Sequence, residues 1–311
     1  MNSLFRRTLN SGIFFSNLFA ILVIAFTRLL VFLKVREGFV ETMMYTEFVA
    51  LPVLMGIISA WFWAELNFKT KNYLGYSLIN GTIAILLSFV FLGEGVICLL
   101  IVSPLIFTFI ISGVLFGRAL FRKKNDKLNM SIGGLFIVLF LVDLFSAHSY
   151  DRSVSDTMII RAGPDEVWKH VVAYDKIKSP EKFWLFRLGL PSPSETTVDG
   201  YCKGAGRKCI FSNGYVFDEK MTAYEPEKIL TFDIIDQPRD PEIMGHIDIL
   251  RGQFILRDNG DGTTTLTGTS WYRLYVSPSW YFDLWARSIT RNVHFRVMEH
   301  IRDLSESGSH V

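Results

Sequence analysis

The sequence predicts an α-helical transmembrane bundle over residues 1–150, followed by an α+β domain over residues 151–311. Three observations predict this division. Five long apolar segments lie before residue 150 and no comparable segment follows it. After residue 206 the hydrophobic residues alternate with the period of two that β-strands require, and along 279–305 they repeat every four residues, as in an amphipathic helix.

The five apolar segments each have about the length that crosses a ~30 Å hydrocarbon core as a helix. The first could be a secretion signal, because Arg6 and Arg7 precede it. However, no small-residue cleavage site closes it and Arg28 lies within it, so an uncleaved span is favoured. The predicted spans are 13–33, 48–66, 73–92, 96–117 and 130–147.

The loop charges predict the orientation of the bundle. Basic residues gather on the cytoplasmic side of membrane proteins, and here they stand before the first span, at Lys69 and Lys71, and most densely over 118–127. With five spans these positions share the cytoplasmic side, and the C-terminal domain is extracytoplasmic. If 130–147, which contains Asp143, does not cross, the domain is cytoplasmic.

Two charged residues lie inside predicted spans, Arg28 and Asp143. A charge at the bilayer centre costs ~2.5–3.5 kcal/mol on insertion scales, so such groups usually face a partner or an aqueous cavity. One hypothesis is that the two residues pair across the bundle or line a polar pocket. The other is that Arg28 extends its long side chain to the interface and Asp143 lies near it.

The first part of the C-terminal domain alternates over 153–162 and is expected to be a strand. Gly163 and Pro164, followed by two acidic residues, predict a helix start, and Val167, Trp168 and Val171 give that helix an apolar face. The region 176–197 is rich in Pro and Ser around the apolar segment 183–190, which predicts a short second helix and a long loop.

A meander of antiparallel strands is expected next, because short turns such as Asn213-Gly214 separate closely spaced alternating segments. The chain then ends in one long helix, 279–305, whose apolar stripe must pack on another apolar surface. A curved sheet around this helix satisfies that need. The predicted strands are 207–212, 215–224, 229–236, 247–257 and 263–275.

Several stretches of this domain are similar to one family. They are IIRAGPDEVWKHV (159–171), GAGRKCIFSNG (204–214), RGQFIL (251–256), LTGTSWYRL (266–274) and RVMEHI (296–301). In their order and motifs they resemble the START-like helix-grip fold of the SRPBCC superfamily, which contains polyketide cyclases and lipid-transfer domains. Within it they resemble in particular bacterial members that are fused behind membrane spans. The resemblance covers about half of the chain and suggests a bacterial inner-membrane location.

The resemblance implies an elongated hydrophobic cavity between the sheet and the terminal helix, with its mouth near 183–190 and 280–285. Arg291 shares a helix face with Arg287 and His294 and could bind a polar head group; alternatively, this face is simply solvated. Aromatic residues would line the cavity or, alternatively, fill an ordinary core. The aromatic candidates are Trp184, Phe211, Phe217, Phe232, Phe254, Trp271, Phe282 and Trp285.

Charge and motifs exclude several classes of function. Residues 1–150 carry 12 Lys and Arg against 7 Asp and Glu, and residues 151–311 carry 20 against 23. A slightly acidic domain does not suit nucleic acid. No His or Cys spacing predicts a metal site, and no glycine motif predicts a nucleotide cofactor. Cys202 and Cys209 could form a disulfide or remain thiols.

Three functions are compatible with these features. The first is a membrane-tethered START-like domain that binds a hydrophobic ligand, a lipid or polyketide-like molecule, at the membrane surface. The second is a cyclase- or dehydratase-type enzyme on such a substrate, although no residue stands out as catalytic. The third is a structural or regulatory membrane protein with a collapsed cavity. The expected partners are membrane lipids or a small hydrophobic ligand, and the sequence leaves the oligomeric state open.

Overall fold

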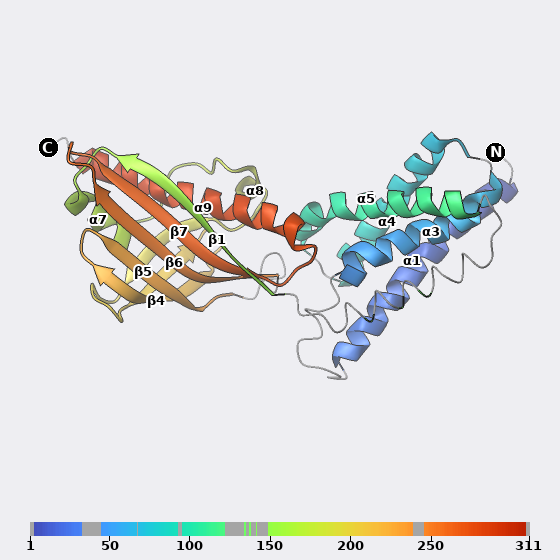
Figure 1. The fold of residues 1–311 in the computed structure, drawn as a ribbon, viewed down its shortest axis with the longest axis horizontal. Helices are drawn as coiled ribbons and strands as arrows, with labels where there is room; N and C mark the ends of the chain where they lie inside the picture. The colour runs from blue at the N-terminus through green and yellow to red at the C-terminus, as the bar shows by residue number, and fades with distance from the viewer. Residues whose placement is uncertain are drawn as a thin grey trace. The chain divides into compact units, whose positions relative to one another are not determined.

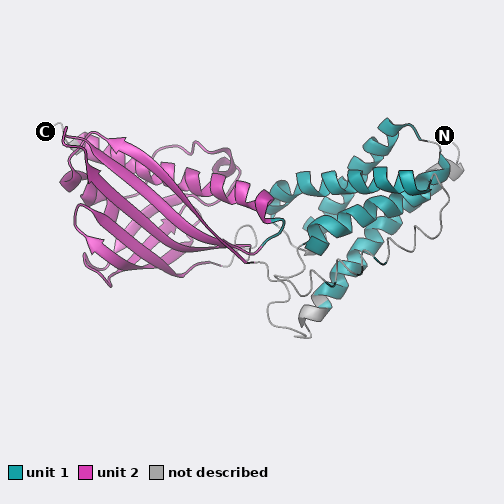
Figure 2. Ribbon diagram, viewed as in Figure 1, with its two compact units in different colours: residues 1–148, 276–278 teal, residues 149–275, 279–311 magenta. Residues whose placement is uncertain are grey.

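The computed structural model describes residues 3–32, 45–66, 68–92, 95–121, 149–238 and 246–308, and the single positions 134, 137 and 141. The chain divides into two compact units (Figure 2). Unit 1 comprises residues 1–148 and 276–278, and unit 2 comprises residues 149–275 and 279–311.

Unit 1 is helical, and four of its described segments are long and apolar enough to cross a membrane (Figure 1). The first and last lie in helices α1 (Ser3–Phe32) and α5 (Val96–Phe121). The second combines a π-helical turn η1 (Thr46–Ala50), α3 (Leu51–Trp63) and a 3₁₀ turn η2 (Ala64–Leu66), and the third lies in α4 (Thr70–Leu92). The predicted spans 13–33, 48–66, 73–92 and 96–117 fall on these segments.

The structure therefore supports four candidate spans among the described residues, not the five that the sequence predicts. The fifth predicted span, 130–147, lies outside the described residues except for the three helical positions 134, 137 and 141. Asp143 and the side chain of Arg28 also lie outside the described part, so their pairing stays a hypothesis.

Polar side chains buried inside unit 1 connect three of its helices. Asn80 of α4 is fully buried, and its Nδ2 donates to Ser59 Oγ of α3 at 3.0 Å and to Ser16 Oγ of α1 at 3.1 Å. Asn17 Nδ2 donates to Asn80 Oδ1 at 2.6 Å. Such bonds between helices satisfy polar groups that hydrocarbon cannot solvate, so this cluster fixes how α1, α3 and α4 align.

Helices α3 and α5 approach so closely that glycine is required on both. A Cβ on Gly113 would overlap the backbone of Val53, and one on Gly56 would overlap the backbone carbonyl of Ile110. Small residues that let helix backbones meet are typical of membrane helix pairs.

Replacing Gly113 with alanine should separate α3 from α5 and destabilise unit 1 by about 1–3 kcal/mol, the usual cost of overpacking. Gly75→Ala is the matched control, because no atom lies within 4 Å of its Cβ position in α4; alanine there should be neutral or stabilising. Thermal unfolding of the full chain in detergent measures both, and equal melting temperatures for the two variants would contradict the close approach.

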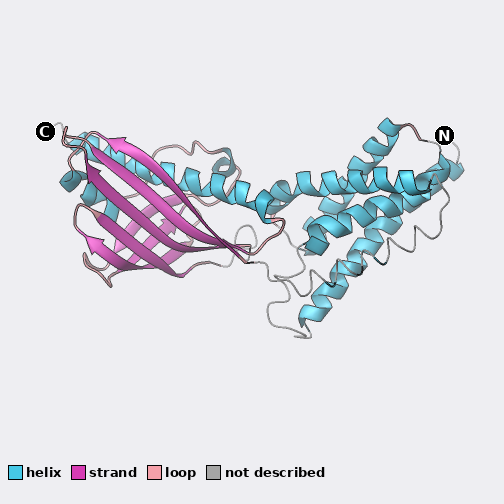
Figure 3. Ribbon diagram, viewed as in Figure 1, coloured by secondary structure: helices cyan, strands magenta, loops and turns pink. Residues whose placement is uncertain are grey.

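Over its described residues, unit 2 consists of a seven-stranded antiparallel sheet and three helices (Figure 3). The spatial strand order is β1-β7-β6-β5-β4-β3-β2, so the first strand pairs with the last and the rest form a meander. Helices α7 (Pro164–Val172) and α8 (Trp184–Arg187) lie between β1 and β2, and α9 (Ser279–Gly308) ends the domain. The strands are β1 (Tyr150–Ile160), β2 (Pro193–Val198), β3 (Gly206–Phe211), β4 (Val216–Glu225), β5 (Ile229–Asp236), β6 (Ile247–Asp258) and β7 (Thr264–Leu274).

The core of unit 2 lies between the curled sheet and the apolar stripe of α9. Figure 1 shows this helix running along the sheet. From α9, Met298 and Ile301 are fully buried, and they meet β7 residues such as Leu266. Because side chains alternate along a strand, the even-numbered residues of β7 face this core and the odd-numbered ones face away. A long helix held in a curled antiparallel sheet fits the helix-grip fold.

The five predicted strands and the terminal helix are confirmed within a few residues. The short second helix is confirmed as α8, within the predicted segment 183–190. The prediction of a long loop after it is wrong in part, because 193–198 form the edge strand β2. Pro193 at its first position masks the strand in the sequence, since proline cannot donate to a ladder and is tolerated at a strand start or an edge.

Candidate functional site

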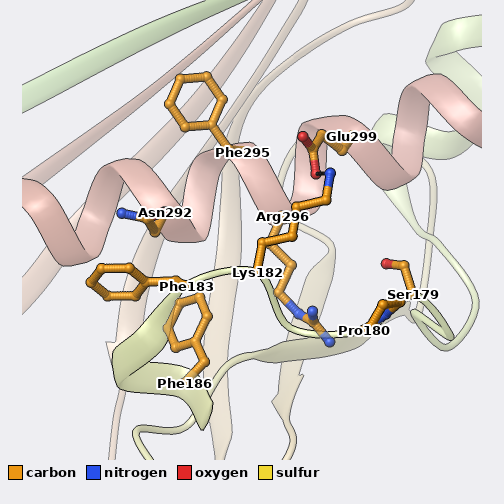
Figure 4. A pocket seen from close by; sticks show the side chains of 9 residues that line it. All are labelled: Ser179, Pro180, Lys182, Phe183, Phe186, Asn292, Phe295, Arg296 and Glu299. Carbon is orange, nitrogen blue, oxygen red and sulfur yellow. Dashed lines mark hydrogen bonds and ion pairs between the residues drawn. The ribbon is translucent and has the colours of Figure 1, made fainter.

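A pocket of about 190 Å³ lies between the segment 179–186 and one face of α9 (Figure 4). One side is apolar, with Phe183 and Phe186, whose ring centroids are 5.1 Å apart. The other side is polar and charged. The lining residues are Ser179, Pro180, Lys182, Phe183, Phe186, Asn292, Phe295, Arg296 and Glu299.

The segment that carries the phenylalanines is anchored on both sides of α8. Leu185 is fully buried and Phe186 nearly so, which holds the short helix against the domain. Arg187 Nε donates to the Glu181 carbonyl at 2.8 Å, and Ser192 Oγ donates to Glu181 Oε1 at 2.6 Å. The wall that faces α9 is therefore held by buried side chains and local hydrogen bonds.

The charged side of the pocket carries an excess of positive charge. Lys182 Nζ lies 2.8 Å from Glu299 Oε2, a bridge that Figure 4 shows between the loop and the helix. Arg296 donates from Nε to the Pro193 carbonyl at 3.0 Å, so no carboxylate neutralises it through that atom. Two cations and one carboxylate thus line this pocket together with the rings of Phe183, Phe186 and Phe295.

The predicted aromatic residues lie elsewhere in unit 2, most of them in close pairs. The ring centroids are 6.3 Å apart for Phe232 and Phe254 and 4.7 Å for Phe211 and Phe217. Phe232, Phe254 and Phe217 are buried. Phe232 and Phe254 therefore belong to the core of unit 2, Phe211 is half-buried beside Phe217, and none of the four lines the pocket beside 179–186.

The other four aromatic candidates are spread more widely. Trp184, 44% exposed, lies 6.4 Å from Trp285 between ring centroids, and Phe282 is buried near the start of α9. Trp271 is an odd-numbered residue of β7, so its side chain lies on the face opposite Tyr272 and the core. Phe186 was expected from the sequence as one of the aromatic walls of the cavity, and it lines this pocket. Phe183 and Arg296 were not among the candidates, although Phe183 lies in the apolar segment 183–190 where the mouth was expected.

Arg291, predicted to bind a polar head group, contacts a carboxylate of the domain itself. Its Nε donates to Asp156 Oδ1 of β1 at 2.8 Å, and His294 Nδ1 lies 3.0 Å from the other oxygen, Oδ2. Arg287 is separate, because it pairs with Asp283 at 3.3 Å. The helix face that the sequence indicates therefore divides into two ion-pair groups.

A buried ion pair crosses β3 and β4. The guanidinium of Arg207 contacts the carboxylate of Glu219, and both side chains are under 5% exposed. Arg207 Nε also donates to the Val172 carbonyl at 3.1 Å, and its guanidinium lies 4.4 Å from the centroid of Phe232. Burial raises the pKa of Glu219, and the positive charge of Arg207 opposes that shift. The pair joins α7 to the sheet.

Replacing Arg207 alone with methionine should destabilise unit 2 by about 3–5 kcal/mol, because it leaves the Glu219 carboxylate buried without its partner. The double variant Arg207→Met, Glu219→Leu should recover most of this loss, since it removes both charges. Thermal unfolding of the full chain measures the two variants. A double variant no more stable than the single one would show that the pair contributes net stability.

Comparisons with known proteins give no family. No family model and no curated protein sequence matches this chain. Solved structures align over about half of it with TM-scores near 0.35. A norcoclaurine synthase from Thalictrum flavum is 12% identical with a TM-score of 0.36, covering 51% of this chain and 96% of its own.

Two bacterial structures align in the same way. A protein from Nitrosospira multiformis is 17% identical with a TM-score of 0.35, covering 51% of this chain and all of its own. The Zhui aromatase/cyclase from Streptomyces sp. R1128 is 12% identical with a TM-score of 0.36, covering 50% and 94%. Sequence identities and TM-scores this low do not assign the chain to a family. The helix-grip assignment therefore rests on the strand order of the sheet and on the long helix α9.

Proposed function

We propose that this chain is a membrane-attached protein whose helix-grip domain binds a small, largely hydrophobic ligand that carries an anionic group. The observation that supports it is the pocket beside α9, which Phe183 and Phe186 line together with Arg296 and Lys182. Ligand sites typically combine apolar walls with a few polar groups that orient the ligand. A fatty-acid-like molecule fits this lining, because its chain would contact the phenylalanine rings and its carboxylate would contact the two cations.

The size of the pocket limits what it holds. Pockets for drug-sized ligands measure ~300–1,000 Å³, whereas this one measures about 190 Å³. It would therefore take a short acyl chain, or the carboxylate end of a longer lipid whose remainder lies outside. Among the lining residues Glu299 is the one carboxylate, and it is paired with Lys182. The lining therefore offers no unpaired carboxylate that could act as a general acid or base. For this reason we favour ligand binding over a cyclase reaction.

Membrane attachment would raise the effective concentration of a ligand that comes from the bilayer, without requiring any new contact. The four long apolar helices of unit 1 support such attachment. The basic residues at 6–7, 69–71 and 118–127 support a bacterial inner-membrane protein with these loops in the cytoplasm. We place the helix-grip domain outside the cytoplasm, which requires 130–147 to cross.

Octanoate should bind the full chain in detergent more tightly than its neutral analogue octanamide. Arg296→Gln should weaken octanoate binding about tenfold, the loss of a charge-assisted hydrogen bond, and leave octanamide nearly unaffected. Phe183→Ala should weaken both. Equilibrium dialysis with radiolabelled ligands measures the dissociation constants.

Arg302→Gln is the matched control for this experiment, because Arg302 lies on α9 but pairs with Asp303 and does not line the pocket. It should leave octanoate binding unchanged. Equal affinities for the acid and the amide in the wild type, or equal losses in both arginine variants, would contradict an anionic ligand at this site.

Cys202 offers a test of the side of the membrane. It is exposed, whereas burial raises the pKa of Cys209 to about 12, which leaves almost no reactive thiolate. After mild reduction, a membrane-impermeant maleimide should label intact spheroplasts at Cys202, and Cys202→Ser should abolish the label. Labelling that appears only after lysis would place the domain in the cytoplasm and show that 130–147 does not cross.

A further inference from the structure

Three residues from distant parts of unit 2 form a continuous hydrogen-bonded chain. Ser270 of β7 has its Oγ 2.8 Å from Nε2 of His294 on α9. The other ring nitrogen of His294, Nδ1, lies 3.0 Å from Oδ2 of Asp156 on β1. Because an ionised carboxylate only accepts hydrogen bonds, Nδ1 carries the hydrogen, and Nε2 accepts from the Ser270 hydroxyl. This is the order of groups that activates a serine nucleophile.

Burial decreases along the hydrogen-bonded chain from Asp156 through His294 to Ser270. The side chain of Asp156 is 3% exposed and that of His294 is 6% exposed, while Ser270 is only half-buried. Burial lowers the pKa of His294 below its usual value, against the opposing attraction of Asp156. Burial thus favours the neutral imidazole, the form in which Nε2 can accept a proton. The group that must meet a substrate, Ser270, is the most accessible of the three.

We propose that Ser270, His294 and Asp156 form a catalytic chain that hydrolyses esters of apolar carboxylic acids. Ser270 Oγ attacks the ester carbonyl while its proton passes to His294 Nε2. The C–O bond to the alcohol breaks, the alcohol leaves with that proton, and an acyl ester remains on Ser270. Water then attacks this ester, with His294 again taking and returning a proton, and releases the acid and free Ser270.

Asp156 and Arg291 are positioning residues in this scheme. Asp156 fixes the ring and tautomer of His294 and stabilises the imidazolium that forms during each step. Arg291 holds the second oxygen of Asp156, and its side chain is 52% exposed, so a positive charge lies at the edge of the cluster. Arg291 therefore acts through Asp156, whose position it holds.

The strand neighbours of Ser270 are apolar, so the acyl group proposed for the substrate is apolar too. The strand partners of Ser270 are Val154 and Gly252, and the ring of Phe232 occupies the space that a side chain on Gly252 would fill. The cluster is separate from the ligand pocket, because His294 faces the sheet while Asn292, Arg296 and Glu299 line the face of α9 toward the segment 179–186. The proposal therefore goes beyond ligand binding and does not depend on it.

A fluorophosphonate probe tests the nucleophile, since an activated serine displaces its fluoride and forms a stable P–O bond. The full chain in detergent should be labelled, and peptide mass mapping should place the label on Ser270. Ser270→Ala should lose it, and His294→Gln should slow labelling at least about 100-fold, the lower range for a general base. Ser155→Ala, an exposed β1 serine bonded to Thr269, is the control and should label as wild type does.

A cluster that serves only to hold α9 on the sheet would give a different result. The melting temperature of Ser270→Ala could fall, but the wild-type chain would carry no label on Ser270 and would not hydrolyse p-nitrophenyl hexanoate above the rate of Ser270→Ala. Either of these outcomes overturns the proposal. Octanoate binding that depends on Arg296 would be unaffected by such a failure, so the two functions are tested separately.

Discussion

The packing of α9 into the curled sheet is the contact on which the rest of unit 2 depends. Met298 and Ile301 lose all their exposed surface there, and burying side chains of this size contributes about 1.5–3 kcal/mol each. The fit is close, because a Cβ on Gly268 of β7 would lie 3.3 Å from the sulfur of Met298. A helix fixed in this way presents its other faces to defined neighbours, the segment 179–186 on one side and β1 on another.

Charged groups inside unit 2 add specificity to this packing. Arg207 pairs with Glu219, and Asp156 with His294 and the half-exposed Arg291. The buried groups Arg207, Glu219 and Asp156 would be costly to leave without partners. Because the partners come from different elements, the pairs are satisfied in one alignment of α9, α7 and the sheet. The apolar stripe alone would tolerate a shifted helix far better.

Unit 1 follows a related rule with different residues. Close helix approach at Gly56 and Gly113 and the buried amide of Asn80 fix its geometry, because apolar surface alone gives little preference among arrangements when the surroundings are also apolar. Under the proposed function, the helix-grip domain reaches the membrane through this bundle. The proposed ligand and the proposed ester substrate are both molecules that a bilayer concentrates.

The sequence by itself determined the local features of both units: apolar segments of membrane-spanning length, strands with a period of two and the stripe of α9. These signals depend on residues close together in the chain. The period of the strands and the stripe of α9 also report which face of the element is buried. Even the edge strand β2 was hidden only because Pro193 and its neighbours resemble a loop.

Only the tertiary structure decided which residues meet. His294 and Asp156 are 138 positions apart, and they come together because β1 pairs with β7 and α9 lies along that pair. The sequence indicated Arg291 and His294 as donors on one helix face but gave no partner for them. Periodicity records that a side chain is buried, whereas the identity of the atom it contacts depends on how the whole sheet closes around the helix.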